Sequence, residues 1–314
     1  MSVPSLIAVT RTQGNNRALK DGSVKPHGFE FSFEEVPVLI NAFRRMVRHL
    51  DYEVCEMALS TYLCAREHGK PFTAIPIFLV RAFHHGAIVV RRDSAIHAPS
   101  DLHGQRVGVN RGYTVTAGVW ARSVLHDEYG VDLNRIRWVL SGDEHVAEYQ
   151  PPDNVEPNRS GASLTELLLA GELAAVIGAE TDDPRLTTLI ENPQQAGLNA
   201  LRTRGHYPIN HLIVIRDDVL ERYPQVAPAV FNAFGQAKQR YIDALHAGSL
   251  PEETPVDRIH RRVAEIIGDP LPYGVEPNRL MLENAIEHCL NQGIIKRRFA
   301  VDQLFATGTH ELIA

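Results

Sequence analysis

The first part of the chain alternates between short apolar runs and longer stretches in which apolar residues recur at helical spacing. Short apolar runs bounded by polar or turn residues are typical of strands, and they predict strands at 6–10, 29–33, 52–54, 73–80 and 87–90. Residues 37–50 carry apolar side chains every three or four positions, which predicts a helix, and a second helix is expected at 57–67. Strands and helices therefore alternate from the start, as they do in α/β proteins.

A second block with the same alternation covers residues 95–205. Its expected elements are a strand at 106–109, a helix at 117–128, a strand at 137–140, a helix at 164–170 and a strand at 174–177. Gly130 and Gly171 follow the two helices, a position where glycine commonly ends a helix. This alternation implies a parallel sheet with helices on its faces. The polar, proline-containing stretch 143–163 is too long for a simple connection, and no element is predicted for it.

The remainder of the chain is one more apolar run and then mostly helix. A strand is expected at 211–215, and helical spacing begins near Val219. Further helices are expected at 257–267, at 279–291 and in the tail from Val301.

This order of elements predicts that one α/β unit is inserted into another. We expect a discontinuous first domain, 1–94 plus 206–314, and an inserted second domain, 95–205, forming two lobes with a central interdomain cleft. Ligands of open α/β sheets sit beyond the carboxyl ends of strands, beside loop amides and helix N-termini. The segments that follow or precede strands there are 81–85, 110–116, 178–181 and 206–211.

Composition and charge narrow the class of protein. The 314 residues suit two domains of ordinary size, and 44% hydrophobic with 22% charged residues is typical of a globular protein. The formal net charge is −6, and no basic stripe is visible, so a nucleic-acid partner is not expected. No window approaches the roughly 18–20 apolar residues of a membrane span, and the N-terminus lacks the pattern of a signal peptide. We therefore expect a soluble, cytoplasmic protein with no membrane partner.

The three cysteines support the same compartment. Cys55, Cys64 and Cys289 show neither CxxC nor Cys/His spacing, so we expect no disulfide framework and no zinc site. They are interpreted as small buried apolar residues in a reducing compartment. Nothing in the sequence determines the oligomeric state, and a homo-oligomer is compatible with it.

Several stretches together resemble one family. They are 51–60, 75–78 with 81–85, 104–109, 116–122 with 127–130, 207–211, and 272–279. In this order and spacing, over about residues 6–306, the chain resembles the 4,5-dihydroxyphthalate decarboxylases, a branch of the type II periplasmic-binding-protein-like fold. The resemblance implies cytoplasmic decarboxylation of an aromatic dicarboxylic acid without cofactor or metal, giving CO2 and a protocatechuate-like product.

Loss of CO2 from an electron-rich ring needs a proton delivered to the carbon that bears the carboxylate, and imidazolium is suited to deliver it near neutral pH. His85 and His211 match the family at strand boundaries and are the candidate proton donors. The alternative is that each is a structural histidine bonded to a neighbouring loop. Glu56, at an expected strand-to-helix junction, is the next candidate, and its alternative is a carboxylate that favours the start of a helix.

The other carboxylate of the substrate needs cations or amides. Arg81 follows an apolar strand, and its planar guanidinium can bond both oxygens of a carboxylate. A surface salt bridge is the alternative explanation for an arginine at this position. Arg111 is a second candidate anion ligand, and Thr114 or Thr116 could cap the following helix while its free amides receive an anion. Simple capping is the alternative there. The remaining predicted substrate-binding residues are Ser60, His84, Tyr113 and Tyr207. No HxH or HExxH pattern points to a metal.

Two competing interpretations stay open. The first is a non-catalytic binding protein for a small anion, because this fold is mostly used for binding and a fold does not imply catalysis. The second is a thiamine-pyrimidine synthase-like or menaquinone-pathway enzyme on the same fold. The matches at 81–85 and 272–279 favour the decarboxylases over both, and the missing signal-peptide pattern counts against a periplasmic binding protein.

Overall fold

The structure is a computed structural model that describes residues 3–179 and 182–314. It forms two compact units. The first contains Met1–Arg81, Ile209–Asn284 and Phe299–Ala314, and the second contains Ala82–Pro208 and Ala285–Arg298. The predicted domain boundaries at 94/95 and 205/206 differ from this division and stay a prediction. In the candidate segment 178–181, residues 180 and 181 lie outside the described residues.

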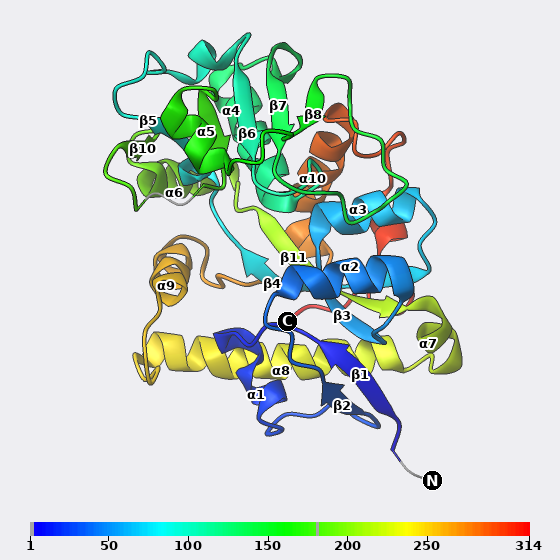
Figure 1. The fold of residues 1–314 in the computed structure, drawn as a ribbon. Coiled ribbons are helices and arrows are strands. Elements are labelled where there is room, and N and C mark those ends of the chain that lie inside the picture. The colour runs from blue at the N-terminus through cyan, green and yellow to red at the C-terminus, as the bar shows by residue number, and fades with distance from the viewer. Residues whose placement is uncertain (1–2, 180–181) are drawn as a thin grey trace. The chain divides into compact units, whose positions relative to one another are not determined.

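The first unit is built on a five-stranded sheet (Figure 1). Its order is β2 (Glu30–Phe33), β1 (Ser5–Val9), β3 (Val54–Ala58), β11 (Ile209–Arg216) and β4 (Phe72–Arg81). β1 pairs in parallel with β2 and β3, whereas β11 pairs antiparallel with both β3 and β4. β3 is buried along its whole length. A buried carboxylate on β3 must therefore find its partners within this sheet or in the loops against it.

The helices of this unit include α1 (Arg17–Lys20), α2 (Leu39–His49), α3 (Leu59–Glu67), α7 (Asp217–Arg222), α8 (Val226–Ala247) and α9 (Pro255–Ile267). α2 packs on β3, and α3 and α7 pack on β11. α8 contacts β4 and buries one face rich in Ala, Val and Phe, as expected of an amphipathic helix. α10 (Arg279–Asn291) begins in the first unit and ends in the second.

The second unit is built on a six-stranded sheet (Figure 1). Its order is β10 (Leu186–Thr188), β5 (Ile88–Arg91), β9 (Ala175–Ile177), β6 (Arg106–Val109), β7 (Arg137–Leu140) and β8 (Val155–Pro157). The pairings among β9, β6, β7 and β8 are parallel, but β5 is antiparallel to β9 and β10. The expected parallel sheet is thus confirmed for the central strands and is wrong at the β10–β5 edge.

The helices of the second unit are α4 (Thr116–Tyr129), α5 (Leu164–Ala170) and α6 (Pro193–Arg204). α5 shows why the sequence folds this way locally. Ser163 accepts a hydrogen bond from the backbone of Glu166, the Glu166 side chain accepts one from the backbone of Ser163, and Gly171 ends the helix with φ 80°. Leu164, Leu167 and Leu168 then face a core that includes Val89, Val139 and Val176.

Three expectations about elements are corrected. The predicted strand at 52–54 and the helix at about 57–67 are both present, but the boundary between them is displaced, because β3 spans Val54–Ala58 and α3 begins at Leu59. Glu56 therefore lies on a strand, not at a helix start. The tail from Val301 is only a short 3-10 turn, Val301–Leu304. Among the described residues, none of the helices combines the length and the apolar character needed to cross a membrane.

Candidate active site

Glu56 and His211 are in direct contact on neighbouring strands of the first unit. β3 and β11 run antiparallel with Ile213 directly opposite Glu56, so His211, two residues away, lies on the same face as Glu56. Nδ1 of His211 donates to Oε1 of Glu56 over 2.6 Å. The other oxygen, Oε2, accepts from the backbone N–H of Arg11 over 2.9 Å. Both oxygens of this fully buried carboxylate are thereby satisfied.

The contact determines which nitrogen of His211 can meet a ligand. A carboxylate can only accept, so Nδ1 carries the proton that bonds Glu56. Phe43 packs edge-on against the imidazole, with ring centroids 5.2 Å apart. The His211 side chain keeps 19% of its surface exposed, and Nε2 has no hydrogen-bond partner in the described part of the chain. Nε2 is therefore free to exchange a proton with a bound molecule.

Arg81 ends β4 in the same sheet, where it pairs with Ile209 of β11. Its side chain is buried, and Nη2 donates to Oδ1 of Asn278. Asn278 cannot turn away, because its Nδ2 donates to the carbonyls of Pro272 at 2.9 Å and Gly274 at 2.8 Å. The loop before α10 thus holds one edge of the guanidinium in a fixed orientation.

Tyr273, in the same loop, is a residue near this site to which the sequence assigns no role. Its side chain is fully buried, and its hydroxyl has no hydrogen-bond partner within 3–179 and 182–314. Burial raises the pKa of the Tyr273 phenol far above its ordinary value; the charges of Asp269 and Glu56 add to the rise and Arg81 opposes it. The only sequence signal for Tyr273 and Asn278 is that 272–279 is one of the stretches that carry the family resemblance.

His85, the other predicted proton donor, lies in the second unit and is fully buried. Its Nε2 donates to Glu128, at 2.9 Å from Oε1 and 3.1 Å from Oε2, and Nη2 of Arg204 donates to the same carboxylate. Burial alone would raise the pKa of Glu128, but the hydrogen bonds and charges of His85 and Arg204 leave it below its ordinary value. Nε2 of His85 is thus bonded within a polar cluster, whereas its buried Nδ1 has no hydrogen-bond partner among the described residues.

A carboxylate of the protein itself, that of Glu144, bonds the backbone N–H groups of the loop before α4. Glu144 accepts from the backbone N–H of Tyr113 at 2.5 Å, from that of Thr114 at 3.1 Å and from the Thr114 hydroxyl at 2.6 Å. The predicted capping by Thr114 or Thr116 is wrong, because Val115 occupies the cap position and no side chain caps the helix. Glu144 fell in the stretch without a predicted element, so the sequence could not identify it. A substrate anion would have to displace it to reach these amides.

Arg111 adopts a left-handed backbone with φ 73°, an uncommon conformation for a residue other than glycine. Its side chain is exposed, and its N–H donates to Oγ of Ser141 over 2.6 Å. Such strain concentrates at functional sites. The conformation agrees with the predicted role of Arg111 as an anion ligand, which stays a prediction.

The remaining candidates are all buried. Ser60 is the second residue of α3, His84 precedes the 3-10 turn His85–Ala87, and the ring of Tyr207 packs at 5.0 Å from that of Phe83. The structure therefore brings Glu56 and His211 together in the first unit, which also contains Ser60 and Arg81. The second unit contains His84, His85, Arg111, Tyr113, Thr114 and Tyr207. In the part that the structure describes, no group of three or more His, Cys, Asp or Glu side chains could hold a metal ion.

Comparison with solved structures establishes the fold. The periplasmic aliphatic sulphonate binding protein SsuA from Escherichia coli matches with a TM-score of 0.53 and 12% identity, over 99% of this chain and 100% of that one. The desulfurization enzyme DSZB matches with a TM-score of 0.57 and 14% identity, over 98% and 97%. The chain therefore has the periplasmic-binding-protein fold, as predicted. The interdomain cleft stays a prediction.

Comparison with curated sequences establishes the family, although no family model matches the chain. The 4,5-dihydroxyphthalate decarboxylase of Comamonas testosteroni is 31% identical over 311 residues, covering 92% of each chain. The protein of the same name from Pseudomonas putida is 34% identical over 209 residues, covering 60% of this chain and 78% of that one. The chain belongs to the 4,5-dihydroxyphthalate decarboxylase family, which confirms the resemblance of its sequence.

Proposed function

We propose that this chain is a carboxy-lyase that removes CO2 from an aromatic dicarboxylate of the 4,5-dihydroxyphthalate type and leaves a protocatechuate-like product. The observation that carries the proposal is the 31% identity to a decarboxylase over 92% of both chains. Sulphonate-binding neighbours share only the fold at 12% identity, and a fold alone carries no activity. A non-catalytic anion-binding protein is therefore the weaker candidate.

His211 is the proposed proton donor. As an imidazolium, it gives the proton on Nε2 to the ring carbon that bears the departing carboxylate. The bond from that carbon to the carboxylate then breaks, its electron pair returns to the ring, and CO2 leaves. Glu56, at 2.6 Å from Nδ1, stabilises the imidazolium and holds its orientation. Water then returns a proton to the neutral imidazole.

Arg81 is the proposed ligand of the carboxylate that stays on the ring. Its guanidinium carries five donors in a planar fork, which suits a carboxylate, and Asn278 holds one edge of that fork. Asn278 is thus a positioning residue for Arg81. Arg111, Ser60, His84, Tyr113, Thr114 and Tyr207 stay predicted substrate-binding residues, and a role of His85 in proton transfer stays the alternative to His211.

The proposal includes a cytoplasmic location and a reaction without cofactor or metal. All three cysteines, Cys55, Cys64 and Cys289, are free and buried, which is consistent with a reducing compartment. Imidazole and carboxylate groups suffice for the proton transfer proposed above.

The test is CO2 release by the purified protein from 4,5-dihydroxyphthalate, compared with phthalate and 3,4-dihydroxybenzoate. We expect release only from the first, because phthalate lacks the ring hydroxyls that stabilise the protonated ring, and 3,4-dihydroxybenzoate lacks the second carboxylate for Arg81. Binding of all three without CO2 release would favour the anion-binding protein.

A further inference from the structure

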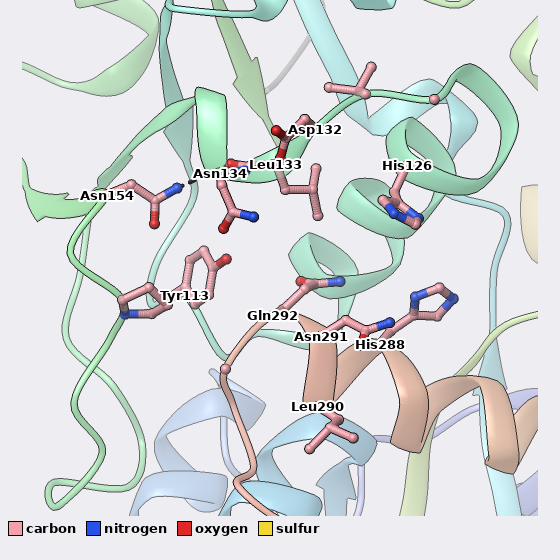
Figure 2. Close-up of a pocket in the computed structure, with 14 residues that line it drawn as sticks. Tyr113, His126, Asp132, Leu133, Asn134, Asn154, His288, Leu290, Asn291 and Gln292 are labelled. Atoms are coloured by element: carbon pink, nitrogen blue, oxygen red, sulfur yellow. Dashed lines mark hydrogen bonds between the residues drawn. The ribbon is translucent and has the colours of Figure 1, made fainter.

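A pocket of about 490 Å³ lies within the second unit (Figure 2). It is formed by Tyr113, by His126 of α4, by residues 130–134 after α4, by Pro152 and Asn154, and by His288 and residues 290–293 at the end of α10. Among the ten predicted site residues, Tyr113 alone lines it. The Glu56–His211 pair belongs to the other unit. The pocket therefore calls for an explanation of its own.

The hydroxyl of Tyr113 is a hydrogen-bonding group aimed into this pocket. The residue is only 2% exposed, and its ring lies 3.8 Å from the guanidinium carbon of Arg122. Its backbone N–H and carbonyl are bonded to Glu144 and Arg122, but its hydroxyl has no partner among the residues that the structure describes. Figure 2 shows this hydroxyl pointing between the side chains of Asn134 and Gln292. A hydroxyl that faces a pocket and has no partner among the described residues can bond a ligand.

The groups around the hydroxyl are polar but mostly uncharged. The side-chain amides of Asn134 and Asn291 are exposed and make no hydrogen bond to described residues. The side chain of Gln292, in contrast, is held in place by two hydrogen bonds. Its Oε1 accepts from Arg122 at 2.7 Å, and its Nε2 donates to the carbonyl of Val119 at 3.1 Å. Leu133 and Leu290 add apolar surface (Figure 2). The lining can thus hydrogen-bond hydroxyl groups on a flat or ring-shaped body.

Charge argues against a dicarboxylate in this pocket. No Lys or Arg is among its described lining residues, and Asp132 contributes a carboxylate. The two lining histidines already face a carboxylate of the protein, because His126 lies 2.8 Å and His288 lies 3.1 Å from the side-chain oxygens of Asp127. Arg122 is buried and does not line the pocket, because its guanidinium donates to Gln292 and to the Tyr113 carbonyl. A dianion would lose its hydration without gaining a paired cation, which costs several kcal/mol. The ligand that matches the lining is uncharged.

We infer that this pocket is a second ligand site, and that it takes a neutral hydroxylated ring such as a catechol. Tyr113, Asn134 and Asn291 bond the ring hydroxyls, and Leu133 with Leu290 contacts the ring. The inference assigns Tyr113 to this site and not to the dicarboxylate site. It rests on the lining alone and does not depend on the proposed function.

Titration calorimetry with catechol tests the inference. We expect binding to the wild type, and a loss of affinity of about tenfold in Tyr113→Phe and in Asn291→Ala, the usual worth of one hydrogen bond. Tyr129→Phe, at the exposed last residue of α4 and outside the lining, is the matched control and should bind as the wild type does. Asn291→Ala changes an exposed side chain, so a folding defect of Tyr113→Phe would not end the test.

Phthalate and a variant of the other site separate this pocket from the dicarboxylate site. Catechol affinity should be unchanged in Arg81→Ala, and phthalate affinity should be unchanged in Asn291→Ala. Absence of catechol binding by the wild type would overturn the inference. It would also be overturned if Tyr113→Phe weakened phthalate and left catechol unaffected, because Tyr113 would then belong to the dicarboxylate site.

Discussion

Nδ1 of His211 lies 2.6 Å from Oε1 of Glu56, although the two residues are 155 positions apart in the sequence. They lie on two neighbouring antiparallel strands, β11 and β3. The carboxylate is fully buried and the imidazole is partly exposed. Such a pair can hold a proton donor in a fixed tautomer while its other nitrogen faces outward. The proposed chemistry depends on this contact.

Replacing Glu56 by Gln should lower kcat, because the imidazolium of His211 loses the carboxylate that orients it and pairs with its charge. KM should change little, because the loss falls mainly on the transition state. The measurement is kcat and KM of both proteins, with urea unfolding of the same preparations. A lower kcat that only follows a smaller folded fraction would mean that Glu56 acts on the fold and not on His211.

Replacing His85 by Leu should reduce stability and spare turnover. The change removes the donor to a half-buried carboxylate, Glu128, that Arg204 alone would then hold. We expect a loss of about 1–3 kcal/mol in the free energy of unfolding and an unchanged kcat for the folded fraction. Urea unfolding and turnover measured on the same preparation check this. A drop in kcat of about 10²-fold or more at unchanged stability would make His85 the proton donor in place of His211.

Removing the hydroxyl of a buried tyrosine should lower the free energy of unfolding for Tyr62 but not for Tyr273. Tyr273 has an unpartnered hydroxyl among the described residues, so Tyr273→Phe should leave the unfolding free energy unchanged or raise it. The hydroxyl of Tyr62 donates to the carbonyl of Leu304 and accepts from the N–H of Ala74, so Tyr62→Phe should cost about 1–3 kcal/mol. Urea denaturation of the two variants provides the comparison. Equal losses would show that Tyr273 has a partner, such as a bound water.

Stability should fall as the pH decreases from about 6.5 to about 4. Burial, with a smaller contribution from the charge of Arg204, lowers the pKa of His206 to about 4, and burial likewise lowers that of His260 to about 4. Each histidine is neutral in the folded state but takes up a proton on unfolding below pH 6.5, so the unfolded state gains protons in this window. Each group contributes at most about 3 kcal/mol, fully present above pH 6.5 and lost toward pH 4. His206→Asn should flatten the slope, and an unchanged slope would contradict the burial of a neutral imidazole.

The elements that the sequence predicts well are those with clear local boundaries. Strands 106–109 and 137–140 and helix 164–170 match β6, β7 and α5 at both ends. The α5 helix is bounded by the capping pair Ser163–Glu166 and by Gly171, which act through contacts of a few residues. The β3–α3 boundary was missed because Met57 and Ala58 are apolar and suit either a strand or a helix.

In the candidate site, the sequence could name individual residues but not the contacts between residues that are distant in the chain. Glu56 and His211 could be named as candidates, but their pairing depends on the register of β3 with β11, which no local pattern encodes. Glu128 and Arg204 meet His85 only after the chain has folded, and Glu144 comes from a stretch without periodicity. Family resemblance identified 272–279, and only the structure assigns Asn278 to Arg81.

The most direct test of the central claim is the formation of protocatechuate and CO2 from 4,5-dihydroxyphthalate by the wild type and by His211→Gln. His246→Gln, an exposed histidine near the end of α8, serves as the matched control. We predict that the wild type and the control each form protocatechuate and CO2 in equal amounts and with the same kcat. For His211→Gln we predict a kcat about 10²–10⁴-fold lower at a similar substrate affinity. Wild-type kcat in His211→Gln, or no product from the wild type, would contradict the account.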